Sequence, residues 1–170
     1  MELDKFIRSV PDFPKKGILF RDITTLIRDA GAFRNAIDKF YEHYKDNRID
    51  KVASTEARGY IFGGAIAYKL GSGVVPVRKP RKLPAPAIRE EYELEYGTDA
   101  LEVHCDAITA GERVLVFDDL LATGGTALAT CRLVERLGGK VIGVAFLVEL
   151  LELNGREKLK AYDLFSVIKY

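Results

Sequence analysis

The feature that most constrains this chain is a short apolar run followed by two acids and a loop of small residues. Residues 114–117 are all apolar, which is typical of a strand covered on both faces of a parallel sheet. Asp118 and Asp119 follow at once, and open α/β sheets bind ligands at the carboxyl ends of their strands. Residues 122–126 are mainly small, glycine or hydroxyl residues, so a ligand can approach their backbone N–H groups closely.

A helix is predicted directly after this loop, over residues 124–138. Its N-terminus favours a phosphate, because unpaired N–H groups and the helix dipole attract anions. The acids precede the loop here, whereas a GxGxxG loop has its acid about 20 residues later and a GxxxxGK[ST] loop contains a lysine. We therefore predict a ribose 5-phosphate site in which Asp118 and Asp119 accept hydrogen bonds from two vicinal hydroxyls. The alternative is a purely structural strand–turn–helix corner.

Length and composition limit the classes of protein. The 170 residues suffice for one domain, and 26 basic against 25 acidic residues give a net charge of +1. Such a balance provides no global field that would recruit nucleic acid or a membrane. The two cysteines, Cys105 and Cys131, form no disulfide framework and have no metal-ligand spacing. With no apolar run of about 18 residues and no signal-peptide pattern, we expect a single cytoplasmic domain, residues 1–170.

Apolar spacing outlines the remaining elements. Residues 3–10 have helical spacing, and Pro11 and Pro14 would end that helix and open an irregular segment as far as Asp22. Strands and helices then alternate, which predicts an α/β fold with a mainly parallel sheet flanked by helices. The expected helices cover residues 32–44 and 59–70, and the other expected strands cover residues 51–54, 73–77, 141–148 and 164–168.

The pattern breaks over residues 78–97, where prolines and charges are dense. A connection of this length is usually an active-site lid or disordered. Alternating residues at 92–96 and 101–104, on either side of Gly97, favour a hairpin-like flap.

Four motifs resemble the type I phosphoribosyltransferase family, and its adenine-using branch in particular. Residues 116–126 resemble the loop that binds phosphoribosyl pyrophosphate (PRPP), and residues 11–22 resemble the N-terminal hood. Residues 56–59 resemble the pyrophosphate loop, and residues 92–97 the flexible catalytic loop. The resemblance covers nearly the whole chain. It implies the fold of that family, with a hood at about residues 1–30 and a lid at about residues 79–100.

The resemblance also implies a reaction. The 5-phosphoribosyl group of PRPP would pass to N9 of adenine, giving AMP and pyrophosphate in purine salvage, with Mg²⁺ as cofactor and a homodimer as the assembly. Because Mg²⁺ dehydrates reluctantly, it would be held by PRPP oxygens and water, and no dedicated protein metal site is expected. The alternatives are a 6-oxopurine or another base, or a PRPP-binding transcription regulator. A regulator would normally add a basic DNA-binding module, and the chain has none.

By this resemblance, PRPP would contact two loops besides Asp118 and Asp119. The family more often has Asp-Ser before the arginine of its pyrophosphate loop, and often a strained peptide there, so the roles of Glu56 and Ala57 stay open. The loop that clamps the 5-phosphate comprises Ala122, Thr123, Gly124, Gly125 and Thr126, and the pyrophosphate loop comprises Glu56, Ala57, Arg58 and Gly59.

The basic run at residues 78–82 has three interpretations. Short basic runs are typical of nucleic-acid contacts or of a solvated face. This run leads into the lid beside the predicted anion site, where cations would neutralise a departing pyrophosphate. Arg78, Lys79 and Lys82 are the candidates, and the family commonly sends such residues across a dimer interface.

Two residues of the lid receive catalytic roles with Arg58. Alternating glutamates on a hairpin normally face solvent. Transfer of a ribosyl group to a purine nitrogen, however, requires that nitrogen to lose a proton, and a carboxylate desolvated by lid closure is a suitable acceptor. The family has a Glu-Tyr pair at this point, so Glu95 is expected to accept the proton and Tyr96 to position the substrate.

The adenine site is expected in the hood. A flat purine stacks on an aromatic or aliphatic plane, and backbone groups recognise its edge. Leu19, Phe20 and Arg21 are the candidates, with a hydrophobic plug as the alternative. His43 and His104 have no partners at metal-ligand spacing and are expected to be surface or packing residues, and Cys131 a small core residue.

Overall fold

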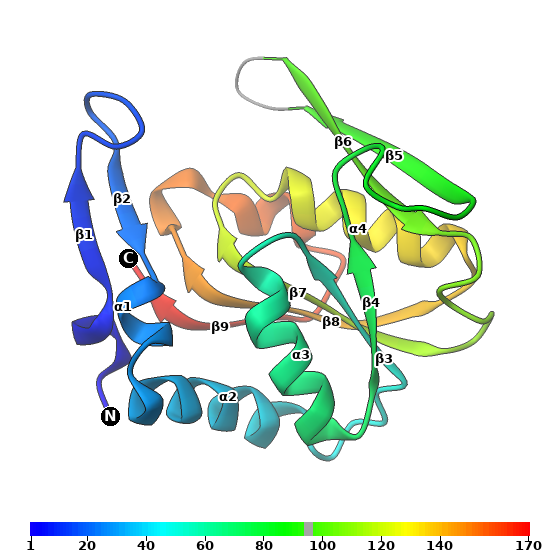
Figure 1. Cartoon of the computed structure of the whole chain (residues 1–170), viewed down its shortest axis with the longest axis horizontal. Coiled ribbons are helices and arrows are strands. Elements are labelled where there is room, and N and C mark those ends of the chain that lie inside the picture. The colour runs from blue at the N-terminus through cyan, green and yellow to red at the C-terminus, as the bar shows by residue number, and fades with distance from the viewer. Residues whose placement is uncertain (94–96) are drawn as a thin grey trace.

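The computed structural model describes residues 1–93 and 97–170, and these form an α/β fold around a five-stranded parallel sheet (Figure 1). The strand order is β4-β3-β7-β8-β9. The strands are β3 (Lys51–Thr55), β4 (Gly73–Val77), β7 (Arg113–Leu121), β8 (Lys140–Glu149) and β9 (Leu164–Lys169).

Helices cover both faces of this sheet. Leu115 and Phe117 point into the core formed with α1 (Thr24–Ile27), α2 (Ala30–Tyr44) and α3 (Gly59–Leu70). Val114 and Val116 point to the opposite face, into the core formed with α4 (Gly125–Arg136). Successive residues of a strand face opposite sides, so an uninterrupted apolar run is what a sheet covered twice requires.

Two antiparallel hairpins flank the sheet at the end to which its strands point (Figure 1). One pairs β1 (Arg8–Pro11) with β2 (Leu19–Asp22), and the other pairs β5 (Ala87–Glu93) with β6 (Thr98–His104). Three short 3-10 helices complete the described chain: η1 (Leu3–Phe6), η2 (Leu151–Leu153) and η3 (Gly155–Leu159).

The predicted parallel α/β fold is confirmed, and the expected helices and strands after residue 30 lie within a few residues of the observed ones. The hairpin on either side of Gly97 is also confirmed in its described part. Cys131 is a buried core residue, and His43 is a packing residue that stacks on Phe165 at 3.9 Å between ring centroids.

The prediction for the first 22 residues was wrong. The helix ends at Phe6. Strand β1 lies mainly in the stretch predicted to be helical, and its partner β2 lies in the segment expected to be irregular. Val10 has helical spacing from Leu3 but pairs with Phe20 across the hairpin. The extended conformation is stabilised by a partner ten residues away, which local spacing does not reveal.

The end of the central strand also differs from the prediction. The two acids were expected to follow the strand, but β7 continues to Leu121. It pairs with β3 only as far as Phe117 and with β8 as far as Leu121. Asp118 and Asp119 therefore lie where β7 extends past its shorter neighbour, with one edge of the strand still paired.

Among residues 1–93 and 97–170, no helix combines the length and the apolar character needed to span a membrane.

Candidate active site

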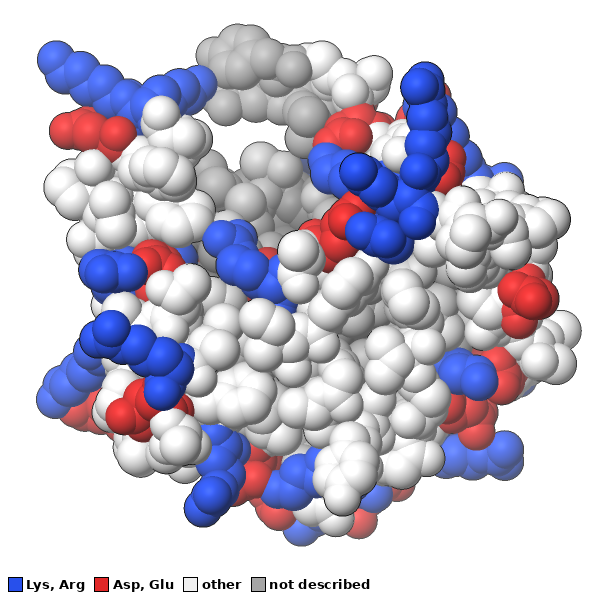
Figure 2. Space-filling model, in the orientation of Figure 1, with Lys and Arg blue, Asp and Glu red and all other residues white. Residues whose placement is uncertain are grey.

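The loops that carry the described predicted site residues come together at the carboxyl ends of β3, β4 and β7, between the two hairpins (Figure 1). Figure 2 shows lysine and arginine side chains on both sides of the hollow at this end of the molecule. Three unrelated stretches of sequence meet here because parallel strands bring their carboxyl ends to one edge.

Asp118 and Asp119 are both buried, with exposed fractions of 8% and 7%. Oδ1 of Asp118 accepts a hydrogen bond from the backbone N–H of Asp119 at 2.9 Å. The same carboxyl lies against the start of α3, where a β-carbon on Gly59 would come within 3.3 Å of Oδ1. Burial, followed by the neighbouring charge of Asp119, raises the pKa of Asp118 well above its usual value.

Arg58 joins the predicted pyrophosphate loop to one of the two acids predicted to bind ribose. Its Nε lies 2.7 Å from Oδ2 of Asp119. Its guanidinium carbon also lies 5.5 Å from the centroid of the Phe20 ring, which brings the hood hairpin to the same place. Residues from the three predicted subsites, for base, ribose and pyrophosphate, are thus in contact through one arginine.

The other two hood candidates are arranged differently. The guanidinium of Arg21 lies 3.8 Å from the centroid of the Tyr170 ring, and its Nη1 donates to the Ser9 hydroxyl at 2.6 Å. Since neighbouring side chains of a strand point to opposite sides, Leu19 lies on the side of Arg21, with an exposed fraction of 48%. Only Phe20 directs its side chain toward Arg58.

The predicted phosphate loop lines a small cavity of about 60 Å³ at the start of α4. Gly124 has φ +82° and ends the loop, and Gly125 begins the helix. A left-handed residue at this point turns the chain so that the first N–H groups of α4 border the cavity. The cavity is lined by Ala122, Thr123, Gly124, Gly125 and Thr126, together with Leu120, Leu121, Ala127 and Phe146.

Glu56 has a role that the sequence left open. Its Oε2 accepts a hydrogen bond from Nη2 of Arg78 at 3.1 Å, and its Oε1 accepts one from the backbone N–H of Lys79. Burial alone would raise the pKa of Glu56, but these hydrogen bonds outweigh it and lower the pKa. Glu56 therefore fixes the two residues that follow β4. The peptide bond between Glu56 and the exposed Ala57 is cis.

Two of the predicted lid cations lie against β6 of the second hairpin: the backbone of Arg78 pairs with Glu102, and Lys79 lies near the Glu93–Thr98 end. The ammonium of Lys79 is paired with Asp99 of β6, and the hydroxyl of Tyr92 donates to that carboxylate at 3.3 Å. Lys82 is exposed, and its carbonyl accepts a hydrogen bond from Nη1 of Arg78 at 3.2 Å. Sequence analysis missed Asp99, because nothing in the alternating pattern of the hairpin distinguishes it from the neighbouring acids.

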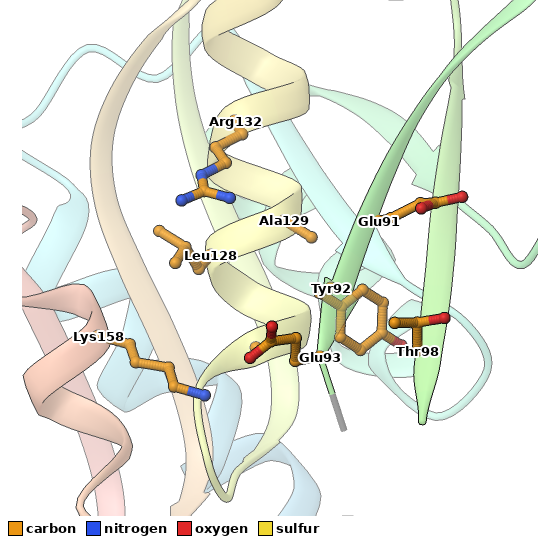
Figure 3. A pocket seen from close by; sticks show the side chains of 9 residues that line it. Glu91, Tyr92, Glu93, Thr98, Leu128, Ala129, Arg132 and Lys158 are labelled. Carbon is orange, nitrogen blue, oxygen red and sulfur yellow. The ribbon is translucent and has the colours of Figure 1, made fainter. Parts of the chain in front are cut away.

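A pocket of about 480 Å³ lies between this hairpin and α4 (Figure 3). Glu93 from β5 and Lys158 from η3 point into it, and Arg132 of α4 lies on its wall. Glu95 and Tyr96, the predicted catalytic pair, lie outside the described residues.

Comparison with known proteins agrees with this arrangement. The phosphoribosyl transferase domain family matches residues 25–170. The chain is 57% identical to an adenine phosphoribosyltransferase of Thermotoga neapolitana over 170 residues, covering 100% of both chains.

Solved structures agree as well. That of adenine phosphoribosyltransferase from Thermoanaerobacter pseudethanolicus matches with a TM-score of 0.97 and 54% identity, covering 99% of this chain and 98% of that one. The Saccharomyces cerevisiae enzyme, solved with an imino-altritol bisphosphate and adenine, matches with a TM-score of 0.91 and 40% identity, covering 97% and 96%. From its motifs, its fold and its relatives, the chain belongs to the phosphoribosyltransferase family of pentosyltransferases and, within it, to the adenine phosphoribosyltransferases.

Proposed function

We propose that this protein transfers the 5-phosphoribosyl group of PRPP to N9 of adenine, producing AMP and pyrophosphate. The observation that carries this proposal is the junction at Arg58, which touches both the ribose acid Asp119 and the hood residue Phe20. The related yeast enzyme was solved with adenine, which favours adenine over a 6-oxopurine.

Asp118 and Asp119 are proposed to hold the ribose of PRPP. A buried carboxyl with a raised pKa is short of hydrogen-bond donors, and two vicinal hydroxyls would supply them. The cavity formed by residues 122–126 would take the 5-phosphate at the start of α4.

Pyrophosphate would be held by Arg58, Gly59 and the cations after β4. When ribose hydroxyls occupy Asp119, the guanidinium of Arg58 becomes available to the leaving group. Glu56 keeps Arg78 and Lys79 at this edge, so little reorganisation is needed when charge develops on the pyrophosphate. Lys82 would join them from the exposed side.

Proton removal from the adenine is assigned to Glu95, with Tyr96 positioning the base. The reaction needs a carboxylate close to the purine nitrogen, and β5, which ends two residues before Glu95 in the sequence, contacts Gly125 at the start of α4. In the hood, Phe20 would supply the plane on which adenine stacks. Leu19 would add apolar contact, and Arg21 would act through its backbone, since its side chain is engaged with Tyr170.

Mg²⁺ is the proposed cofactor, and the residues at this edge fit an ion that arrives with its substrate. Mg²⁺ usually keeps several waters and binds substrate phosphates. Asp118 and Asp119 are assigned to the ribose hydroxyls, so the ion would be held by PRPP oxygens and water beside the phosphate and pyrophosphate loops. When bound, the ion would neutralise charge on the pyrophosphate oxygens.

A homodimer is the proposed assembly. Ile61 and Tyr68 of α3 and Val74 of the edge strand β4 are 44%, 90% and 43% exposed, and an apolar face of this kind suits a second copy. Light scattering of the wild type and of Tyr68→Glu would test it. We also propose a cytoplasmic location, which the free thiols of Cys105 and Cys131 support.

The direct test is a base panel. Purified protein, Mg²⁺ and PRPP are incubated with adenine, hypoxanthine, guanine, orotate or uracil, and pyrophosphate release is measured. We expect release with adenine, and kcat/KM lower by roughly 10² to 10⁴ with hypoxanthine, because its 6-carbonyl and N1–H mismatch a pocket built for an amino group. Equal values for adenine and hypoxanthine would refute the base assignment, and no release with any base would refute the reaction.

A further inference from the structure

Behind the phosphate loop lies a hydrogen-bonded carboxylate that none of the steps above uses. Glu149 is the last residue of β8, and its side chain is 3% exposed. Nη2 of Arg156 donates to its Oε2 at 2.8 Å, and Nε of Arg156 and the hydroxyl of Ser166 donate to the same carboxylate. A bidentate contact between an arginine and a carboxylate is strong and directional, so it fixes the start of η3 relative to β8.

The turn fixed in this way touches the phosphate loop through backbone. A β-carbon on Gly124 would lie 2.6 Å from the carbonyl oxygen of Gly155. A β-carbon on Gly155 would lie 2.3 Å from the carbonyl oxygen of Ala122. Both glycines are buried, so the two segments pack directly on one another without intervening side chains.

The opposite side of the loop rests on the Glu93–Thr98 end of the lid hairpin. A β-carbon on Gly125 would lie 3.2 Å from the Tyr92 ring and 3.2 Å from the carbonyl oxygen of Glu93. The loop is therefore held between two supports, and the one at Gly155 is tied to β8 of the central sheet by the Glu149–Arg156 ion pair.

We propose that Glu149, Arg156 and Gly155 are positioning residues for the 5-phosphate half of PRPP. The Glu149–Arg156 pair holds Gly155 against Ala122 and Gly124, which keeps the N–H groups of residues 123–126 aimed at the phosphate before it arrives. This inference rests on the proposed role of the phosphate loop and extends it to a second layer of residues, because preorganised donors cost no rearrangement on binding.

The proposal makes a selective prediction about the two halves of the substrate. The phosphate loop lies between β7 and α4, whereas the pyrophosphate loop lies between β3 and α3. Loosening the turn at Gly155 should therefore weaken ribose 5-phosphate binding and leave pyrophosphate binding unchanged. A general loss of stability would weaken both.

The experiment measures dissociation constants of ribose 5-phosphate and of magnesium pyrophosphate by calorimetry, with thermal unfolding as a folding check. Arg156→Lys keeps the positive charge but loses the bidentate contact with Glu149. Gly155→Ala places a methyl group against the carbonyl oxygen of Ala122. For each variant we expect the dissociation constant of ribose 5-phosphate to rise roughly 10- to 100-fold, because a small displacement of the binding groups has effects of this size. The dissociation constant of magnesium pyrophosphate should stay within about twofold. Asp38→Asn, which removes the ion pair with Lys69 between α2 and α3, is the matched control.

Two results would overturn the proposal: folded variants with unchanged ribose 5-phosphate affinity, or an equal loss for both ligands. If Arg156→Lys does not fold, the milder Ser166→Ala, which removes one hydrogen bond to Glu149, decides between the same outcomes. The wild-type protein tests the phosphate loop itself, with ribose as the ligand that lacks the phosphate. If ribose 5-phosphate binds no more tightly than ribose, the proposed function of the loop fails, and the inference fails with it.

Discussion

Two neighbouring strands of the sheet carry buried carboxylates near their ends, and two of these, Asp118 and Glu149, are in opposite electrostatic situations. Asp118 and Asp119 on β7 are 8% and 7% exposed, and Glu149 on β8 is 2% exposed. Burial alone would raise the pKa of all such groups. The pKa of Asp118 is raised well above its usual value, whereas Arg156 and Ser166 outweigh burial and lower the pKa of Glu149.

The difference lies in where each carboxylate finds its donors. Glu149 receives them from the protein itself, so its ionised form is stable without a ligand. Asp118 receives a single backbone donor and faces the charge of Asp119. A ligand with two hydroxyls would supply further hydrogen-bond donors to Asp118 and Asp119 on β7, whereas Glu149 on β8 already has its donors within the protein. An uncompensated electrostatic cost thus lies where substrate is proposed to bind, whereas at Glu149 the cost of burial is outweighed by Arg156 and Ser166.

The largest effect is expected from a further carboxylate, Glu95, which is proposed to accept a proton from adenine rather than to bind the ribose. Glu95→Gln keeps the shape but removes the basic oxygen, so kcat should fall by about 10² to 10⁴ with PRPP affinity near the wild-type value. Glu91→Gln on the same hairpin, where the carboxylate pairs with Arg89 on the surface, is the control. Single-turnover kinetics that retain most of the rate would remove Glu95 from the mechanism.

The second largest effect is expected from breaking the ion pair between Glu149 on β8 and Arg156. Arg156→Ala leaves the Glu149 carboxylate buried without its main donor, and loss of one partner from such a pair costs about 3 to 5 kcal/mol of unfolding free energy. Urea unfolding measures this, and Arg89→Ala, from an exposed pair, should change stability by less than about 1 kcal/mol. Equal small effects at both positions would mean that Glu149 is not held as described.

The incomplete β7 pair should respond in the opposite direction. Asp118→Asn removes a carboxyl whose ionisation is disfavoured, so the folded state should gain stability at neutral pH. The same change should weaken PRPP binding by about 1.5 to 3 kcal/mol, the usual value of a charge-assisted hydrogen bond. Calorimetric binding and urea unfolding of one variant test both signs. A variant that is destabilised and binds PRPP normally would show that Asp118 is structural.

Sequence was sufficient for the parts of this comparison that depend on local pattern. The apolar run before Asp118 predicted a doubly covered strand, which the structure confirms. The order of acids and loop predicted a ribose phosphate site, which stays a prediction. Both follow from strand periodicity and from where parallel sheets bind ligands.

The supporting contacts were beyond sequence, because they join segments that only the fold brings together. Glu149 and Ser166 are 17 residues apart, and Lys79 and Asp99 are 20 apart. The β1–β2 hairpin was missed for a related reason, since the pairing of Val10 with Phe20 overrides a weak helical spacing. Positions where a carboxylate finds an internal partner are therefore the ones that sequence patterns describe least well.

The smallest effect, and the one that tests the comparison most directly, is the pH dependence of stability. Glu149 has a lowered pKa in the folded state, so its stabilisation is present above its unfolded value of about 4.3 and is lost as pH falls through the folded value. Asp118 has a raised pKa, so its contribution is present below about 3.9 and is lost as pH rises through the folded value. Glu149→Gln should therefore be less stable than wild type at neutral pH, and this difference should disappear in acid. Asp118→Asn should become more stable than wild type as pH rises. Neither difference curve should change by more than about 1.4 kcal/mol per pH unit, the limit for one proton. Unfolding free energies of the wild type and both variants, measured between pH 3 and pH 8, test this. If the differences from wild type change with pH in the same direction for both variants, Glu149 and Asp118 do not differ in the way described.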